Sequence, residues 1–185
     1  MDLPLWQNGP IQAAHAIRAF HGVTLLEHYL EATARLLTED LGFEEGATSG
    51  ERQRFNAPAG GPASRVDILT RPDQGFGRIA VGSVHHVAFR IAGTPEQSSW
   101  REQAIANGLR VTSMRDRTYF RSVYFQEPGG VLFEIATDAP GFAIDESVDD
   151  LGSSLQLPEW LEPQREILQK QLPPLKLPIF ETATP

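Results

Sequence analysis

Histidines and carboxylates recur in this sequence at similar spacing, and these residue types can bind metal ions. His21 is followed by Asp67, and His86 is followed by Glu134. The step from 21 to 86 is 65 positions, and the step from 67 to 134 is 67 positions. Because the sequence contains no cysteine, protein donors to a metal must be nitrogen or oxygen atoms. The repeat predicts two related modules that share one concave site large enough for a metal ion.

A single strand histidine is more often a hydrogen-bonded core residue than a metal ligand. The repeated pairing of imidazole and carboxylate shifts the interpretation of His21 and His86 towards a metal site. His15 and His28 have no such pairing, and we interpret both as surface residues.

Each module is predicted to contain a strand, a helix and further strands. The β-branched segment 17–26 indicates the first strand, and the apolar spacing in 31–43 indicates a helix that ends at Gly42. In the second module, Thr94 as the cap and Pro95 at the first helical position are typical of a helix start, and Asn107-Gly108 is typical of a helix end. The remaining predicted strands and the domain boundaries are as follows: strands 51–58, 63–70, 84–91, 112–126 and 131–137; an arm 1–15; a domain 16–137 with modules 16–80 and 81–137; and a proline-rich tail 138–185 with a helix near 160–171.

Strand alternation predicts the direction in which the candidate ligands point. In 84–91, the apolar side chains Val87 and Phe89 face one way, and His86 faces the other. The same alternation predicts that the side chains of Asp67 and Glu134 point to the opposite face of their strands from their apolar neighbours. A carboxylate in the middle of a strand is costly to bury unless it is paired or coordinated, which favours the metal hypothesis.

Composition narrows the possible partners. Sixteen basic and 24 acidic residues give a formal charge of −8 without a basic run, so a nucleic-acid partner is not expected. No stretch approaches the roughly 18 apolar residues of a membrane span, so no membrane partner is expected. The first residues carry neither a basic leader nor an apolar secretion segment, so we expect a cytoplasmic protein.

The segments GSVHHVAFRI and DRTYFRSVYFQEPGGVLFEIATDAPGFAIDE closely resemble the vicinal oxygen chelate superfamily. Within it they are similar to the ring-cleaving dioxygenases of hydroquinones, which are relatives of the glyoxalase and bleomycin-resistance proteins. The resemblance covers nearly the whole chain from about Ile17 onward. It implies an α+β fold in which two paired βαβββ modules form an incomplete barrel around a divalent metal. Members of the hydroquinone group are usually about twice as long, and this sequence resembles their C-terminal half.

The resemblance also implies roles for particular residues. His86 and Glu134 match two iron ligands, and His85 matches an active-site histidine. Tyr124 and Arg117 match residues that line the substrate pocket. Members of the hydroquinone group have four modules, and their third ligand is a histidine in the first of the four, which has no counterpart in this sequence. His21 stands where catechol-cleaving relatives carry a ligand, so we expect it to supply the third donor, within one chain or across a homodimer.

Two imidazoles and one carboxylate leave room on a metal for a substrate oxygen and O2. We therefore expect Fe(II), with Mn(II) as an alternative, and cleavage of a hydroquinone- or catechol-like aromatic ring. In this hypothesis His85 acts as an acid–base group and Tyr124 as a hydrogen-bond donor, while Arg117 holds an anionic substituent or neutralises charge.

Each assignment has an alternative. His85 could cap a strand edge, Arg117 could lie in a solvated loop, and Tyr124 could pack on the outer face unless the hairpin loop has an odd number of residues. Asp67 could be a fourth ligand, which would suit a glyoxalase-like, non-redox site better. The alternatives for the whole chain are a metal-free small-molecule binding module of the resistance type and one half of a split dioxygenase.

Overall fold

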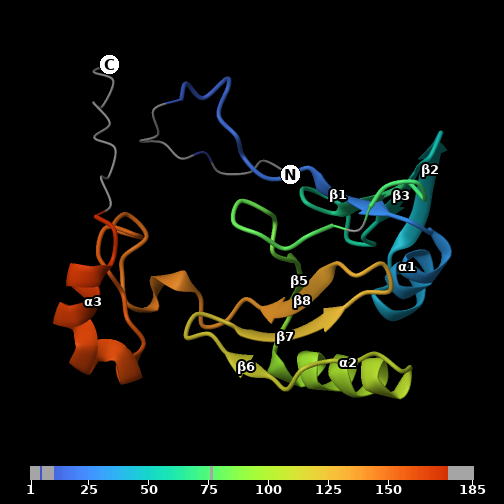
Figure 1. The fold of residues 1–185 in the computed structure, drawn as a ribbon. Coiled ribbons are helices and arrows are strands. Elements are labelled where there is room, and N and C mark those ends of the chain that lie inside the picture. Colours follow the sequence, from blue (N-terminus) through green and yellow to red (C-terminus); the bar gives the residue numbers. More distant parts are fainter. Residues whose placement is uncertain (1–4, 6–10, 76, 175–185) are drawn as a thin grey trace.

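The structure is a computed structural model that describes residue 5, residues 11–75 and residues 77–174. Parts of the predicted arm and tail, at 1–4, 6–10 and 175–185, lie outside the described residues. Figure 1 shows two small sheets with their helices, followed by a C-terminal segment that carries α3 at the opposite end of the molecule from α1.

The first module contains one four-stranded sheet in the order β1-β4-β3-β2. β1 and β4 run parallel to each other, whereas β3 runs antiparallel to both of its neighbours, β4 and β2. A π-helical turn over Leu36–Asp40 continues the helix, and Gly42 follows it with a φ of 69°. The elements are β1 (Gly22–Glu27), α1 (Glu31–Arg35), β2 (Glu44–Ser49), β3 (Arg52–Asn56) and β4 (Arg65–Thr70).

The second module repeats this arrangement, with the sheet order β5-β8-β7-β6 and a parallel pair formed by β5 and β8. Gly108 follows its helix with a φ of 94°, as the sequence predicted for the end of this helix. The elements are β5 (Val87–Ile91), α2 (Thr94–Ala106), β6 (Arg115–Asp116), β7 (Arg121–Gln126) and β8 (Leu132–Thr137). In the tail, 3-10 turns at Phe142–Ile144 and Glu159–Gln164 precede α3 (Arg165–Gln171).

This architecture confirms the predicted α+β fold with two βαβββ modules. Within the described residues the two sheets stay separate and do not close into one barrel. No helix in the same part of the chain combines the length and the apolar character needed to cross a membrane.

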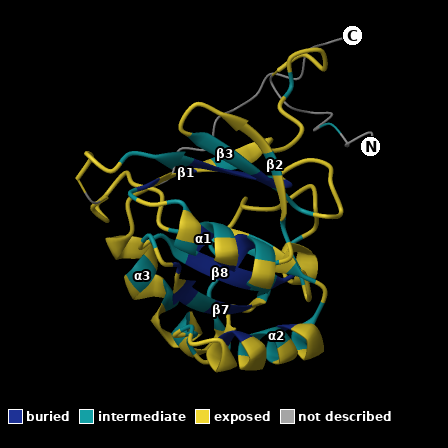
Figure 2. Cartoon of the chain, turned by 90° about the vertical axis from the view of Figure 1, so that its right-hand side faces the viewer, coloured by how far each residue is buried: buried dark blue, intermediate teal, exposed yellow. Residues whose placement is uncertain are grey.

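One apolar core joins the two modules. The side chains that alternate inward from β4 and β8, such as Ile68 and Phe133, are fully buried, and they belong to a single cluster. The aromatic rings of Phe43 and Phe89 meet edge to face across the modules, and the Trp100 indole donates a hydrogen bond to the Asp40 carbonyl. Figure 2 shows β7 and β8 as buried strands between largely exposed outer surfaces. The merged core therefore fixes how the two sheets lie relative to each other.

Several local predictions need correction. The strand predicted at 84–91 begins at Val87, the strand predicted at 112–126 divides into β6 and β7, and β2 was not among the predicted strands. The first strand begins at Gly22 rather than at residue 17, because the partner strand β4 begins at Arg65, directly opposite Gly22. The residue that caps α2 is Gly93, and Thr94 is already helical. These differences arise because pairing with a neighbouring strand sets the ends of a strand and backbone dihedral angles set the ends of a helix, and local residue preferences fix neither to the residue.

Candidate metal and substrate site

His86 and Glu134 form the centre of the candidate site. His86 immediately precedes β5, and Glu134 lies in the middle of the neighbouring strand β8. The His86 Nε2 atom lies 2.7 Å from Glu134 Oε2, and Glu134 is 2% exposed. The parallel pairing of β5 with β8 places these two side chains together, as strand alternation predicted.

The donor atoms of this pair suit a shared cation. His86 Nδ1 lies 2.9 Å from His85 Nδ1, so one of these two nitrogens carries the proton between the rings. When the Nδ1–H group of His86 donates this hydrogen bond to His85, the Nε2 lone pair of neutral His86 faces the carboxylate of Glu134. Two facing lone pairs require a proton or a metal ion between them, and a buried carboxylate beside an imidazole is a donor set for a divalent metal.

Tyr124 orients the carboxylate. Its strand β7 pairs with β8 so that Tyr124 lies directly opposite Glu134. The Tyr124 hydroxyl donates a hydrogen bond of 2.9 Å to Glu134 Oε1, and Ser122 donates one of 3.1 Å to the Tyr124 hydroxyl. The sequence prediction that Tyr124 shares the face of Glu134 is confirmed. Ser122 was missed, although its position two residues before Tyr124 on the same strand puts it on the same face.

An open pocket of about 480 Å³ adjoins the pair. The Arg117 guanidinium carbon lies 5.4 Å from the centre of the Tyr124 ring, a cation–π distance. His85 is exposed at the pocket edge next to His86. Every residue that lines this pocket belongs to the second module: His85, His86, Thr112, Arg115, Arg117, Tyr124 and Leu132.

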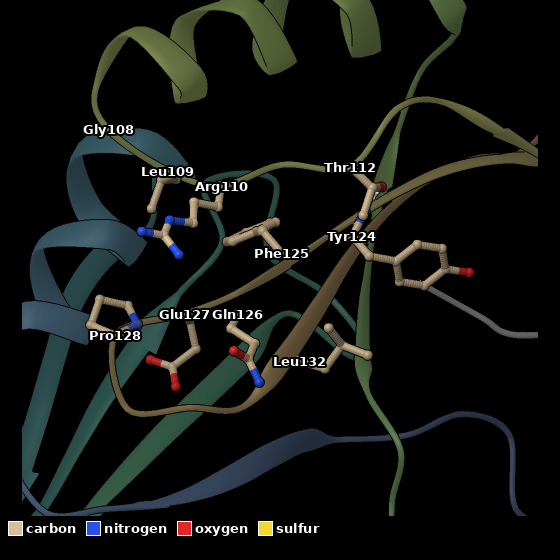
Figure 3. Close-up of a pocket in the computed structure, with 10 residues that line it drawn as sticks. All are labelled: Gly108, Leu109, Arg110, Thr112, Tyr124, Phe125, Gln126, Glu127, Pro128 and Leu132. Atoms are coloured by element: carbon tan, nitrogen blue, oxygen red, sulfur yellow. Dashed lines mark hydrogen bonds between the residues drawn. The ribbon is translucent and has the colours of Figure 1, made fainter.

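A second hollow of about 550 Å³ shares Thr112, Tyr124 and Leu132 with this pocket. Figure 3 shows Tyr124 at one end of it and Glu127 with Pro128 at the other. The surface beside Tyr124 is therefore hollowed along β7 as well as towards the histidines.

The structure does not bring His21 to His86 and Glu134. His21 lies just before β1 and is exposed, and its Nδ1 atom accepts a contact of 3.5 Å from Arg65. In the described part of the chain, no group of three or more histidine, aspartate or glutamate side chains is placed to hold a metal ion.

Strand register explains this outcome. Thr24 pairs with Asp67 in the first module, and Ala88 pairs with Glu134 in the second. Counting back two residues from Thr24 and Ala88 makes Gly22, rather than His21, the counterpart of His86. A Cβ atom on Gly22 would lie 2.6 Å from the Arg65 carbonyl oxygen, so this position has no room for a side chain. The sequence spacing had paired His86 with His21, one residue before its structural counterpart Gly22. A shift of one residue turns a strand side chain to the opposite face.

Asp67 is engaged in a salt-bridge cluster. Arg54 donates to Asp67 from Nε at 2.8 Å and from Nη2 at 3.0 Å, and Arg52 donates at 3.0 Å. The hydrogen bond from Arg54, reinforced by Arg52, lowers the pKa of the Asp67 carboxyl below its ordinary value. Both carboxylate oxygens thus have guanidinium partners, so the geometry favours a structural role for Asp67 over the alternative of a fourth ligand.

The chain is similar to several bacterial proteins over most of its length. It is 42% identical over 173 residues to "Putative ring-cleaving dioxygenase MhqE" of Bacillus subtilis (strain 168), which covers 92% of this chain and 55% of that protein. Identity to "Putative ring-cleaving dioxygenase MhqO" of the same organism is 38% over 172 residues, or 93% and 54% of the two chains. The "Chlorohydroquinone/hydroquinone 1,2-dioxygenase" of Sphingobium indicum is 31% identical over 172 residues, with 90% and 53% covered. The chain thus spans about half the length of these relatives.

Solved structures give the same picture, although no family model matches the sequence. A crystal structure described as a "putative dioxygenase" from Bacillus subtilis has a TM-score of 0.81 and 39% identity, covering 87% of this chain and 51% of that one. A glyoxalase/dioxygenase from Nostoc punctiforme shares the fold at a TM-score of 0.58 and 21% identity, covering 69% and 96%. With its two βαβββ modules and these relatives, the chain belongs to the vicinal oxygen chelate superfamily of glyoxalases, bleomycin-resistance proteins and dioxygenases.

Proposed function

We propose that this chain contributes the metal-binding pair of an Fe(II)-dependent ring-cleaving dioxygenase that acts on hydroquinone- or catechol-like aromatics with O2. The observation that carries the proposal is the contact between His86 Nε2 and Glu134 Oε2 beside an open pocket. The names of the similar proteins, one of them a chlorohydroquinone/hydroquinone dioxygenase, support this reaction class.

The residues present fit a metal as part of its ligand set. His86 and Glu134 would hold the ion, and Mn(II) is the alternative to Fe(II). The metal would supply adjacent positions for a substrate oxygen and O2. Because Tyr124 donates to the second carboxylate oxygen, the Glu134 side chain keeps its orientation when the other oxygen binds a cation.

The remaining pocket residues would act on the substrate. His85 stands at the pocket edge, and its imidazole is suited to accept the proton of a ring hydroxyl. Arg117 and Arg115 line the same pocket and have no ion-pair partner among the described residues, so their guanidinium groups would neutralise the resulting phenolate.

In this proposal the third donor to the metal is not a residue of the second module that holds His86 and Glu134. His21 of a second copy in a homodimer is the donor that the sequence offers. The greater length of the relatives makes a donor from another polypeptide segment the competing source.

The test is anaerobic reconstitution with Fe(II), followed by oxygen uptake with a panel of hydroquinones and catechols. Near-stoichiometric iron that is lost in His86→Ala, together with oxygen consumption, is the expected result. If the His21→Ala variant binds as much iron as the wild type, the third donor is a different residue. Absence of oxygen uptake with every ring compound would refute the dioxygenase proposal for this chain.

A metal-free binding module is the second candidate, because the described residues gather only two donors beside the pocket. Titration with hydroquinone of the protein to which no iron has been added distinguishes the two functions. Binding of the ring compound without iron, unchanged in Glu134→Gln, would favour the binding module.

A further inference from the structure

Two buried glutamates from different modules lie near the turn of the β7–β8 hairpin. Glu27 is the last residue of β1, and Glu127 directly follows β7. Each is 2% exposed. Neither belongs to the candidate metal site, and two buried carboxyl groups near each other are costly when both are ionised.

Glu127 is hydrogen-bonded from both modules. Thr33 of α1 donates a hydrogen bond of 2.6 Å to its Oε2 atom, and the Val131 amide donates one of 2.7 Å to its Oε1 atom. Both of its carboxylate oxygens therefore have hydrogen-bond donors. Glu127 thereby joins the hairpin turn to the helix of the first module.

Glu27 has the opposite surroundings. Its Oε1 atom is buried and has no hydrogen-bond partner among the described residues. Its other oxygen occupies the space where a Cβ atom of residue 129 would lie, which the glycine at that position leaves free. Burial, and secondly the charge of Glu127, raise the pKa of the Glu27 carboxyl to about 7.

Two charged or titratable side chains next to Glu27 have other partners among the described residues. Arg71 donates its backbone N–H to the Glu27 carbonyl, but its guanidinium group pairs with Glu51. The His28 Nε2 atom contacts the Gln74 carbonyl at 2.6 Å. Glu127 is therefore the charged group that acts on Glu27 from the facing hairpin.

We propose that Glu27, packed against the turn beside Glu127, is a protonation latch, which holds the β7–β8 hairpin against the first module while Glu27 is neutral and loosens when Glu27 ionises. A neutral Glu27 carboxyl adds no negative charge to the buried space that it shares with Glu127. Loss of that proton leaves two buried negative charges between the modules.

The latch borders the candidate site. Gly129, Gly130 and Leu132 line a hollow of about 290 Å³ together with His85. The same hairpin carries Tyr124 on β7 and Glu134 on β8. A shift of the turn would therefore move the wall of this hollow, which shares His85 and Leu132 with the candidate pocket.

The direction of the pH effect follows from the raised pKa. Between the ordinary glutamate pKa of 4.5 and about 7, the folded protein holds a proton that the unfolded chain has released. Stability therefore falls as pH rises through this window and levels off above it.

Urea unfolding between pH 5 and 8 tests the latch. We expect the unfolding equilibrium constant of the wild type to rise more than about tenfold over this range, and that of Glu27→Gln less than about threefold. Glu44→Gln, an exposed substitution on β2, is the matched control and should keep the wild-type slope. Equal slopes in the wild type and Glu27→Gln would overturn the proposal.

Carbon NMR of the Glu27 side-chain carboxyl in the wild-type protein gives a second readout that needs no variant to fold. We expect titration near neutral pH, with protection of the Val131 amide falling over the same range. In Glu127→Gln, the titration should move towards the ordinary glutamate value. Titration of Glu27 near pH 4.5, or an unchanged midpoint in Glu127→Gln, would refute the pair.

Discussion

The imidazole of His86 and the carboxylate of Glu134 touch at 2.7 Å, although they are far apart in sequence. The contact exists because β5 and β8 are parallel neighbours, so residues at the start of the first strand and in the middle of the second face the same side. Their counterparts in the first module are a glycine without room for a side chain and an aspartate bound by two arginines. The two modules therefore share a topology but differ in their chemistry.

Replacing Glu134 by glutamine should weaken Fe(II) binding by at least about tenfold, because an amide is a poorer ligand for a hard cation than a carboxylate. Iron content after anaerobic reconstitution measures this. Asp67→Asn, the counterpart substitution in the first module, is the control and should leave the iron content unchanged. Equal iron in the wild type and Glu134→Gln would remove the carboxylate from the site.

Tyr124→Phe should lower metal affinity by roughly 10- to 100-fold while leaving the fold intact, because Glu134 loses the donor that orients it. Competition with a chelator measures the affinity. Tyr119→Phe, which removes an exposed hydrogen bond to Asp145, should have no effect. A Tyr124→Phe protein with wild-type affinity would show that the hydroxyl does not support the carboxylate.

Asp67→Asn should reduce the free energy of unfolding at pH 7 by about 1–2 kcal/mol, because it weakens charge-assisted hydrogen bonds from Arg52 and Arg54 that are partly screened by solvent. Since the pKa of Asp67 is lowered, its contribution is present above the ordinary aspartate value and disappears as pH falls below it. Urea unfolding at pH 7 and near pH 3 measures both effects. A stability difference between variant and wild type that is as large near pH 3 as at pH 7 would contradict this explanation.

Gly129→Ala should destabilise the protein by about 1–3 kcal/mol, because the added methyl group would overlap the Glu27 carboxyl. Thermal unfolding measures the change. Gly75→Ala, where the new atom would meet open space, is the control. In a Glu27→Ala background the penalty of Gly129→Ala should shrink, and a penalty that stays the same would place the clash elsewhere.

The sequence by itself determined much of this protein. Apolar alternation identified the inward faces of β4, β5 and β8, and it placed Asp67 and Glu134 on the opposite faces. Glycines at 42 and 108 marked the helix ends, where the backbone adopts positive φ values. These features are local, because side-chain direction in a strand and the conformational freedom of glycine depend on neighbouring residues only.

Tertiary structure decided the composition of the site. The pairing of β1 with β4 sets the counterpart of His86 at Gly22 and leaves His21 outside the strand. Packing of the modules through a common core brought Glu27 to Glu127, and cross-strand pairing gave Arg54 to Asp67. Spacing along the chain does not encode these relationships, because register is set by hydrogen bonding between distant strands, and a shift of one residue reverses the face of a side chain.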